Sequence, residues 1–127
     1  MKKMLYLFVV LSLLGGMLLA ACGGGGSAPT EKPAGDAVAG KTAYDKTCVA
    51  CHGSDGKGMP GLGKDLTTSQ FFRETSDADL LAFVKTGRPA SDPANTTGVD
   101  MPPKGGNPAL TDEDIQNIIA YVRTLQQ

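Results

Sequence analysis

The stretch "CVACHGSDGKGMPG", residues 48–61, decides how this chain of 127 residues is to be interpreted. It holds two of the three cysteines, the only histidine, and Met59, which is one of five methionines. Two cysteines and a histidine at close spacing can bind zinc, exchange disulfides or attach a haem. The choice among these chemistries depends on how the three residues are spaced and on what the rest of the chain offers.

Cys48, Cys51 and His52 form the pattern C-x-x-C-H, which is the attachment signature of a c-type haem. On one helical turn, two cysteines three residues apart project to the same side, where each thiol can add to one vinyl group of the porphyrin. The imidazole of the next residue then lies under the iron as its axial ligand. The spacing therefore predicts one covalently bound haem c.

The other chemistries lack partners in this sequence. A structural zinc site uses four ligands, and the remaining cysteine, Cys22, lies far upstream in a glycine-rich segment. A thioredoxin-like pair belongs in a βαβ setting, and no run here shows the alternation of a strand. A disulfide between Cys48 and Cys51 suits an oxidising compartment but gives no reason for the sole histidine to follow Cys51 directly.

A second axial ligand has to come from elsewhere, and a methionine sulfur is the leading remaining candidate. Met59 is close to His52 in the sequence. To bind the iron from the opposite face, the chain between them would have to pass around the porphyrin edge. Met101 lies in a long loop and is followed by Pro102 and Pro103, which remove backbone donors and fix φ. We predict Met101 as the ligand. The alternatives are Met59, an open sixth position, or Met101 as a flexible pocket filler.

The chain begins with the features of a secretory signal. Two lysines follow Met1, an uncharged apolar run extends over residues 4–20, and "LAAC", residues 19–22, resembles the lipobox of bacterial lipoproteins. We predict a lipoprotein signal peptide over residues 1–21 and a lipid on Cys22. The alternative is an uncleaved anchor, because the run approaches the ~20 residues that cross a bilayer. Either form places the domain in the cell envelope, facing the periplasm or the exterior.

Residues 22–36 are predicted to be the lipidated cysteine and a flexible tether, since they hold glycine, serine, proline and charge without apolar periodicity. Fully extended, the tether would span roughly 45–50 Å. Residues 1–21 hold two of the 12 basic residues and no acidic one, so the mature chain carries ten basic and 13 acidic residues, a net charge of −3. That balance argues against binding to nucleic acid, which needs a basic face.

The folded part, residues 37–127, is predicted to be all-α. Helices are expected over residues 37–48, over 77–86 after a cap at Ser76, and after a cap at Thr111, with a shorter turn over 69–74. Gly40 lies inside the first helix, where glycine costs about 1 kcal/mol, and this indicates close approach by another segment. Residues 88–110 contain five prolines and form a long loop, which often marks a functional segment.

From about Asp36 to Gln127 the chain resembles the small class I cytochromes c, in particular bacterial proteins akin to cytochrome c6 and the cytochrome subunits of oxidases. The resemblance rests on "GKTAYDKTCVACHG" at 40–53, "GVDMPP" at 98–103 and "LTDEDIQNIIAYVRTL" at 110–125. It implies about 3–5 short helices wrapped around one covalent haem, with His52 and Met101 as axial ligands. It also implies that the first and last helices cross closely, with Gly40 and Tyr44 meeting the face near Tyr121.

One motif departs from this family. Many relatives have G-P-x-L about a dozen residues after the ligand histidine, where a backbone carbonyl holds the imidazole N–H. Here the matching stretch is "GKDL", residues 63–66, so Lys64 replaces the proline and the stiffness of proline is missing. The carbonyl is still present, and the Lys64 side chain is expected to be solvated. Candidate donors to the haem propionates are Arg88, Asn95, Thr96 and Thr97.

These features predict a membrane-tethered protein that passes single electrons through a haem ligated by His52 and Met101. With both axial positions filled, the iron has no site for a substrate, so we expect an electron carrier and not an enzyme. Its partners would be redox proteins, such as a membrane oxidase or a quinol-oxidising complex. The alternatives are a fixed monohaem subunit of a larger respiratory or photosynthetic complex, and a haem peroxidase or gas sensor with an open sixth position.

Overall fold

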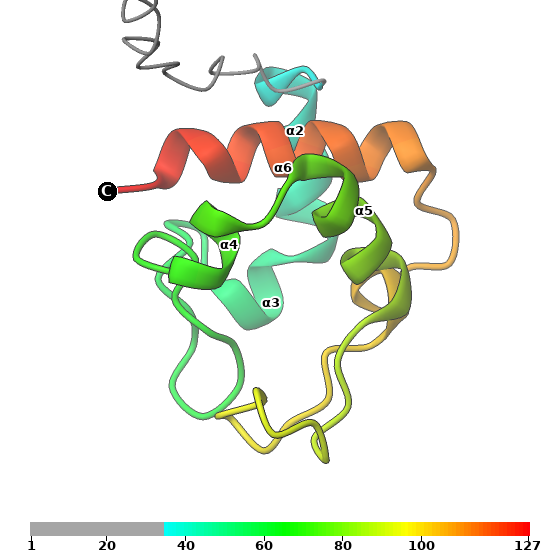
Figure 1. The fold of residues 1–127 in the computed structure, drawn as a ribbon. Helices are drawn as coiled ribbons and strands as arrows, with labels where there is room; N and C mark the ends of the chain where they lie inside the picture. Colours follow the sequence, from blue (N-terminus) through cyan, green and yellow to red (C-terminus); the bar gives the residue numbers. More distant parts are fainter. Residues whose placement is uncertain (1–34) are drawn as a thin grey trace, which may run out of the picture. The chain divides into compact units, whose positions relative to one another are not determined.

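The computed structural model describes residues 35–127. The predicted signal peptide, Cys22 and nearly all of the predicted tether lie outside the described residues. Within them, the chain forms five α-helices, one 3₁₀ helix and no named strand (Figure 1), which confirms the all-α prediction. In chain order these are α2 (Ala37–Thr47), α3 (Val49–His52), α4 (Gln70–Glu74), α5 (Asp77–Thr86), η1 (Pro103–Gly106) and α6 (Asp112–Leu125).

Helix α2 begins and ends close to the predicted positions. The Asp36 carboxylate caps it by accepting from the backbone N–H groups of Val38 and Ala39 at 2.7 and 3.2 Å. The helix ends at Thr47, one residue before the predicted end, and the N–H of Cys48 still bonds to the Tyr44 carbonyl at 2.8 Å. Helix α3 follows at once, so the C-x-x-C-H motif occupies a single turn.

Helices α2 and α6 cross in Figure 1, as the family resemblance implies. The crossing is so close that a Cβ on Gly40 would lie 1.8 Å from the carbonyl oxygen of Asn117. One turn further along α2, the ring of Tyr44 meets the ring of Tyr121 edge to face, with 5.3 Å between the ring centroids. The structure therefore explains why a helix contains Gly40.

The core lies between α6 and the elements that face it. The amphipathic pattern of α6 places one apolar stripe inward, while α5 and α4 contribute Leu80 and Phe72. Burying an aliphatic side chain stabilises the fold by about 1.5–3 kcal/mol. The buried cluster consists of Tyr44, Phe72, Leu80, Leu110, Ile115, Ile118, Ile119, Tyr121 and Val122.

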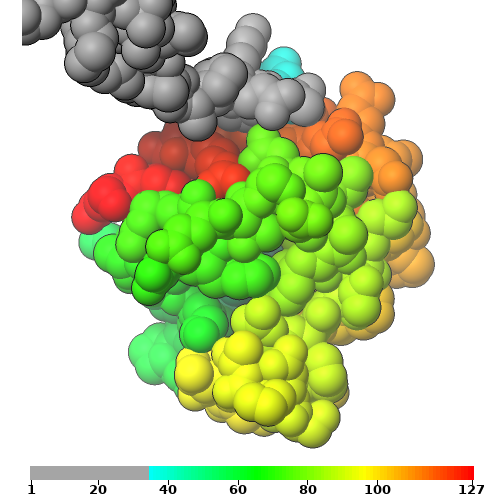
Figure 2. Space-filling model, in the orientation of Figure 1, coloured from blue at the N-terminus to red at the C-terminus, as the bar shows by residue number. Residues whose placement is uncertain are grey.

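The long loop over residues 88–110 is more ordered than its composition suggests. Arg88 and Met101 form an isolated antiparallel bridge, and η1 follows directly after Pro102. Between them, the Asn95 amide donates to the carbonyls of Pro89 and Val99 at 3.2 and 2.8 Å. Figure 2 shows the residues near 95–100, in yellow, gathered beneath the green residues of α4 and α5.

Among residues 35–127, no helix has the length and apolar character needed to cross a bilayer.

Candidate functional site

One cavity brings together the residues that the sequence singled out. It is bounded by α3, α5, α6 and the loop before η1, and its walls are mainly apolar. Cys48, Cys51, His52 and Met101 all line it. The apolar part of the lining includes Phe72, Leu80, Phe83, Val84, Leu110, Ile118, Ile119 and Val122.

The two cysteines reach the cavity from one turn of helix. Both thiols are free and partly buried, so they do not form a disulfide. Burial and, to a smaller extent, the nearby Cys51 raise the pKa of the Cys48 thiol to about 11. A thiol with such a pKa is protonated at neutral pH, which is the opposite of the low-pKa nucleophile used in disulfide exchange.

His52 is held by the backbone carbonyl of Lys64, the residue that replaces the proline of the G-P-x-L motif. Its Nδ1 lies 2.9 Å from the backbone oxygen of Lys64. Because a carbonyl can only accept, Nδ1 carries the proton and the Nε2 lone pair is left for a metal. The buried Tyr44 hydroxyl donates to the Gly53 carbonyl at 2.7 Å, which fixes the chain just after His52. The Lys64 side chain is exposed, as expected.

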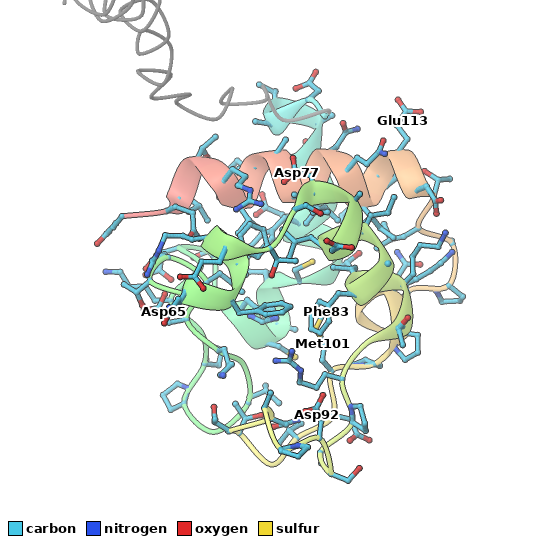
Figure 3. All side chains as sticks on the ribbon, in the orientation of Figure 1. Asp65, Asp77, Phe83, Asp92, Met101 and Glu113 are labelled. Carbon is cyan, nitrogen blue, oxygen red and sulfur yellow. The ribbon has the colours of Figure 1, made fainter. Side chains whose placement is uncertain are left out.

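The two candidate methionines are placed differently. Met101 is partly buried and lines the cavity together with Phe83 of α5; both are labelled in Figure 3. Met59 is 46% exposed and lies outside the cavity lining. Of the two, only Met101 faces the space that contains His52.

A cation also lines the cavity. The Arg88 guanidinium contacts the rings of both Phe71 and Phe83, 4.9 and 4.7 Å from their centroids. The Arg88 Nε is 3.3 Å from an Asp92 carboxylate oxygen, which makes an ion pair. The Nε is nevertheless buried and makes no hydrogen bond within residues 35–127. A buried N–H without a hydrogen-bond partner lowers the stability of the fold unless a ligand accepts from it.

The other candidate donors to propionates are less suitable. Asn95 and Thr97 line the cavity, whereas Thr96 is exposed and does not. The Asn95 amide already donates to two carbonyls, and its oxygen accepts from Thr97 and Gly98. Arg88 is therefore the best remaining donor to a carboxylate in the cavity.

The residues present fit a haem c. The cavity offers two free thiols, an imidazole with a free Nε2 and a thioether, all within apolar walls. The Arg88 Nε, which makes no hydrogen bond within residues 35–127, suits a carboxylate. Within residues 35–127, no three histidine, cysteine or acidic side chains form a group that could hold a metal ion, so the described residues give the zinc alternative no support.

Comparison with known proteins agrees with this fit. The family model described as cytochrome c matches residues 37–126. The chain belongs to the cytochrome c family. This cytochrome c domain accordingly binds a covalent haem c and transfers electrons, which confirms the prediction made from the C-x-x-C-H motif.

The relatives of the cytochrome are small c-type cytochromes and an oxidase subunit. It is 33% identical to cytochrome c-555 of Chlorobaculum thiosulfatiphilum over 87 residues, 68% of this chain and 93% of that protein. It is 37% identical to cytochrome c-554(547) of Halothiobacillus neapolitanus over 100 residues, 73% of this chain and 100% of that protein. It is 30% identical to the cbb3-type cytochrome c oxidase subunit CcoP of Rhodobacter capsulatus, over 70% of this chain and 29% of that protein. No solved structure matches this chain at the level of significance that these relatives reach.

The sequence did not indicate the aromatic surroundings of Arg88. Phe71 and Phe83 come from two different helices and also pack against each other, with centroids 5.0 Å apart. No local spacing links them to Arg88. The one available signal was a charged residue at the end of α5, immediately before a proline-rich loop.

Proposed function

We propose that this cytochrome passes single electrons through a haem iron ligated by His52 and Met101, and that a lipid on Cys22 holds it at a membrane surface. One observation carries the ligand assignment: His52 and Met101, from distant parts of the chain, line the same cavity as both cysteines. The anchor is supported by the basic start, the apolar run and "LAAC".

Each of these residues has a distinct task. Cys48 and Cys51 would hold the group covalently, and His52 presents Nε2 because its Nδ1 is bonded to Lys64. Met101 offers a neutral sulfur from a backbone that the bridge to Arg88 and two following prolines make rigid. When bound, the haem supplies a one-electron iron couple, and methionine ligation raises its reduction potential.

The ligand assignment is tested by replacing Met101 with alanine. The haem-loaded variant should lose the methionine-to-iron charge-transfer absorption of the oxidised form, have a lower reduction potential, and bind carbon monoxide rapidly when reduced. Met59→Ala is the matched control and should leave all three properties as in the parent protein. If Met101→Ala changes none of them, the position is open or filled by another group, and the peroxidase or sensor alternative gains support.

Electrons would enter and leave at the apolar edge of the cavity. Leu62, Phe71 and Val99 are 40%, 41% and 38% exposed, although each lines the cavity. Exposed apolar groups beside a redox centre suit brief contact with a partner protein. The partners proposed are redox proteins such as a membrane oxidase or a quinol-oxidising complex.

The anchor is tested by replacing Cys22 with serine. We expect the parent protein to sediment with membranes and to carry a lipid on its N-terminal cysteine by mass spectrometry. Cys22→Ser should remove the lipid. If the variant remains in the membrane fraction as an uncleaved chain, the apolar run over residues 4–20 is itself the anchor.

A second candidate function is supported by the similarity to CcoP, an oxidase subunit. In that case the same domain would be a fixed subunit of a larger complex, with the tether strengthening its docking. Purification after mild detergent extraction separates the two functions. A complex that survives a salt wash indicates a subunit, and release of the cytochrome alone indicates a carrier.

A further inference from the structure

The carbonyl that holds His52 belongs to a segment without proline. The second nitrogen of a metal-bound histidine usually donates to an outer partner, which fixes the ring and raises the basicity of the ligand. Here that partner is the Lys64 carbonyl, 2.9 Å from Nδ1. Lys64 is exposed and cannot restrict its own φ as proline would. Another group has to fix the orientation of this carbonyl.

Asp65 directly follows that carbonyl, and its carboxylate forms hydrogen bonds with Thr67 and Thr68, which we call the Asp65 clasp. Its Oδ1 accepts from the N–H and the hydroxyl of Thr67, both at 2.7 Å, and from the N–H of Thr68 at 3.3 Å. The Thr67 hydroxyl, with the backbone N–H groups, holds the pKa of Asp65 below its usual value, so the carboxylate accepts at neutral pH. An aspartate that bonds to N–H groups two and three residues ahead fixes its own backbone.

The clasp is connected to the carbonyl through one planar peptide. The Lys64 oxygen and the Asp65 nitrogen lie in the same peptide plane, so fixing the backbone of Asp65 limits how that plane can rotate. The plane also lies close to Gly58, where a Cβ would be 2.7 Å from the Lys64 carbonyl carbon and 2.9 Å from the Asp65 nitrogen. Rotation of the peptide is therefore restricted both by the Asp65 hydrogen bonds and by the contact with Gly58.

The far end of the clasp is anchored in the fold. Thr67 is 4% exposed, and its carbonyl accepts from the backbone N–H of Gln127 at 3.0 Å. Gln126 also donates to the Leu66 carbonyl. The segment after Lys64 is thus attached to the end of α6, and Asp65 connects it to the partner of His52.

We propose that Asp65 is a positioning residue: its side chain holds the Lys64 carbonyl against the Nδ1–H of His52 and thereby sets how strongly His52 donates to the haem iron. The proposal rests on His52 being a ligand, as in the proposed function. Loss of the clasp would weaken this hydrogen bond, make the imidazole less basic and stabilise the oxidised iron less. The reduction potential should therefore rise.

Three variants of the haem-loaded protein separate the clasp from the charge of Asp65. Asp65→Ala removes both, and Asp65→Asn keeps an oxygen acceptor but removes the charge. Thr67→Val removes only the buried hydroxyl donor and leaves the charge. Asp55→Ala is the matched charge control, because Asp55 likewise accepts from a backbone N–H two residues ahead, that of Lys57 at 3.1 Å.

Two measurements are made on each variant: the reduction potential at neutral pH and the solvent exchange of the His52 Nδ1 proton in the reduced protein by NMR. Asp65→Ala should raise the potential most and speed exchange about tenfold, a factor that corresponds to one hydrogen bond of ordinary net strength. Thr67→Val should shift both in the same direction by less. Asp65→Asn should keep the slow exchange, and Asp55→Ala should leave exchange unchanged.

The proposal is overturned if Asp65→Ala and Thr67→Val leave exchange as slow as in the parent protein, or if Asp65→Ala shifts the potential no more than Asp55→Ala. Failure of the proposed function gives a different result. If His52 is not a ligand, its ring resonances in the parent protein lack the large shifts of a group beside haem, before any variant is made.

Discussion

The backbones of Arg88 and Met101 pair in both directions, each donating its N–H to the carbonyl of the other at 2.8 Å. This bridge connects Arg88, which follows the C-terminal end of α5, with Met101, the proposed sulfur ligand. It fixes Met101 on both sides of its Cα, and Pro102 restrains the chain that follows. The position of the sulfur therefore depends on the turn that ends α5.

Gly87 makes that turn possible, so we predict that Gly87→Ala damages the site as well as the fold. Gly87 has φ of 75° and ψ of −168°, and a Cβ would lie 2.3 Å from the Met101 carbonyl oxygen. A residue other than glycine in such a conformation costs about 1–3 kcal/mol, and the overlap adds to this. Thermal unfolding should show a loss of about 3 kcal/mol or more, and the methionine-to-iron absorption should weaken.

Gly98→Ala is the matched control for this prediction. Gly98 has φ of 71°, but a Cβ there would meet nothing within 4 Å. The Gly98→Ala protein should lose only about 1–2 kcal/mol of unfolding free energy, because of the unfavourable backbone conformation, and should keep the methionine-to-iron absorption. Equal losses in the two variants would show that contact with Met101 is irrelevant.

A second prediction concerns the crossing of α2 and α6. Helix propensity alone says that Gly40→Ala stabilises by about 1 kcal/mol. The structure reverses the sign, because the new Cβ would lie 1.8 Å from the Asn117 carbonyl oxygen. We expect chemical denaturation to show a loss of about 3 kcal/mol or more.

Val38→Ala tests whether the effect is specific to the crossing. Val38 is on the same helix and is 80% exposed, so this change should stay within about 0.5 kcal/mol of the parent. A stable Gly40→Ala protein would mean that the helices can separate without cost, and the close crossing would be wrong.

Much of the fold could be predicted because its signals are local. Ser76 and Thr111 each accept from a backbone N–H three residues ahead, at 3.1 Å, and these caps placed the starts of α5 and α6 correctly. Gly40 indicated a close contact because it is unfavourable in an isolated helix. The spacing of Cys48, Cys51 and His52 predicted the haem for the same reason, since all its information lies within one turn.

What the sequence did not show depends on contacts between distant segments. The contact of Arg88 with the rings of Phe71 and Phe83 depends on how α4 and α5 pack. Lys104 adopts φ of 54°, unusual for a residue with a side chain, and its Nζ donates to the Leu110 carbonyl at 2.7 Å. Asp65 resembled any polar loop residue until its bonds to Thr67 connected it with the partner of His52. No short motif encodes such relationships.

A third prediction concerns Arg123, which ties α6 to the junction of α4 and α5. Its Nη2 donates to Asp77 Oδ1 at 2.8 Å and to the Thr75 carbonyl at 2.6 Å, and its Nη1 donates to the Phe72 carbonyl. Arg123→Ala would leave these partly buried acceptors unpaired, so unfolding should show a loss of about 2–4 kcal/mol. Arg123→Lys should recover only part of this, because lysine lacks the planar fork.

The exposed pair of Lys41 and Asp45 is the control for Arg123. Their side chains are 55% and 42% exposed and approach to 2.6 Å within α2. Exposed pairs contribute little because solvent screens them, so Lys41→Ala should leave the unfolding midpoint nearly unchanged. If both variants unfold at the same midpoint, the network around Arg123 contributes no more than a surface pair.

The last prediction is the pH dependence that comes from the cap of α6. The Asp114 carboxylate accepts from the N–H and hydroxyl of Thr111 at 2.9 and 2.7 Å, and these bonds lower its pKa in the folded state. A lowered folded pKa stabilises the fold above the unfolded value of about 3.9, and this contribution is lost as the pH falls through the folded pKa. The Asp114→Ala protein should therefore have a lower unfolding midpoint than the parent at pH 7. Between about pH 5 and pH 2 it should lose less stability than the parent. Glu113→Ala, in the same turn, should keep the parental slope, and parallel slopes for all three proteins would contradict the assignment.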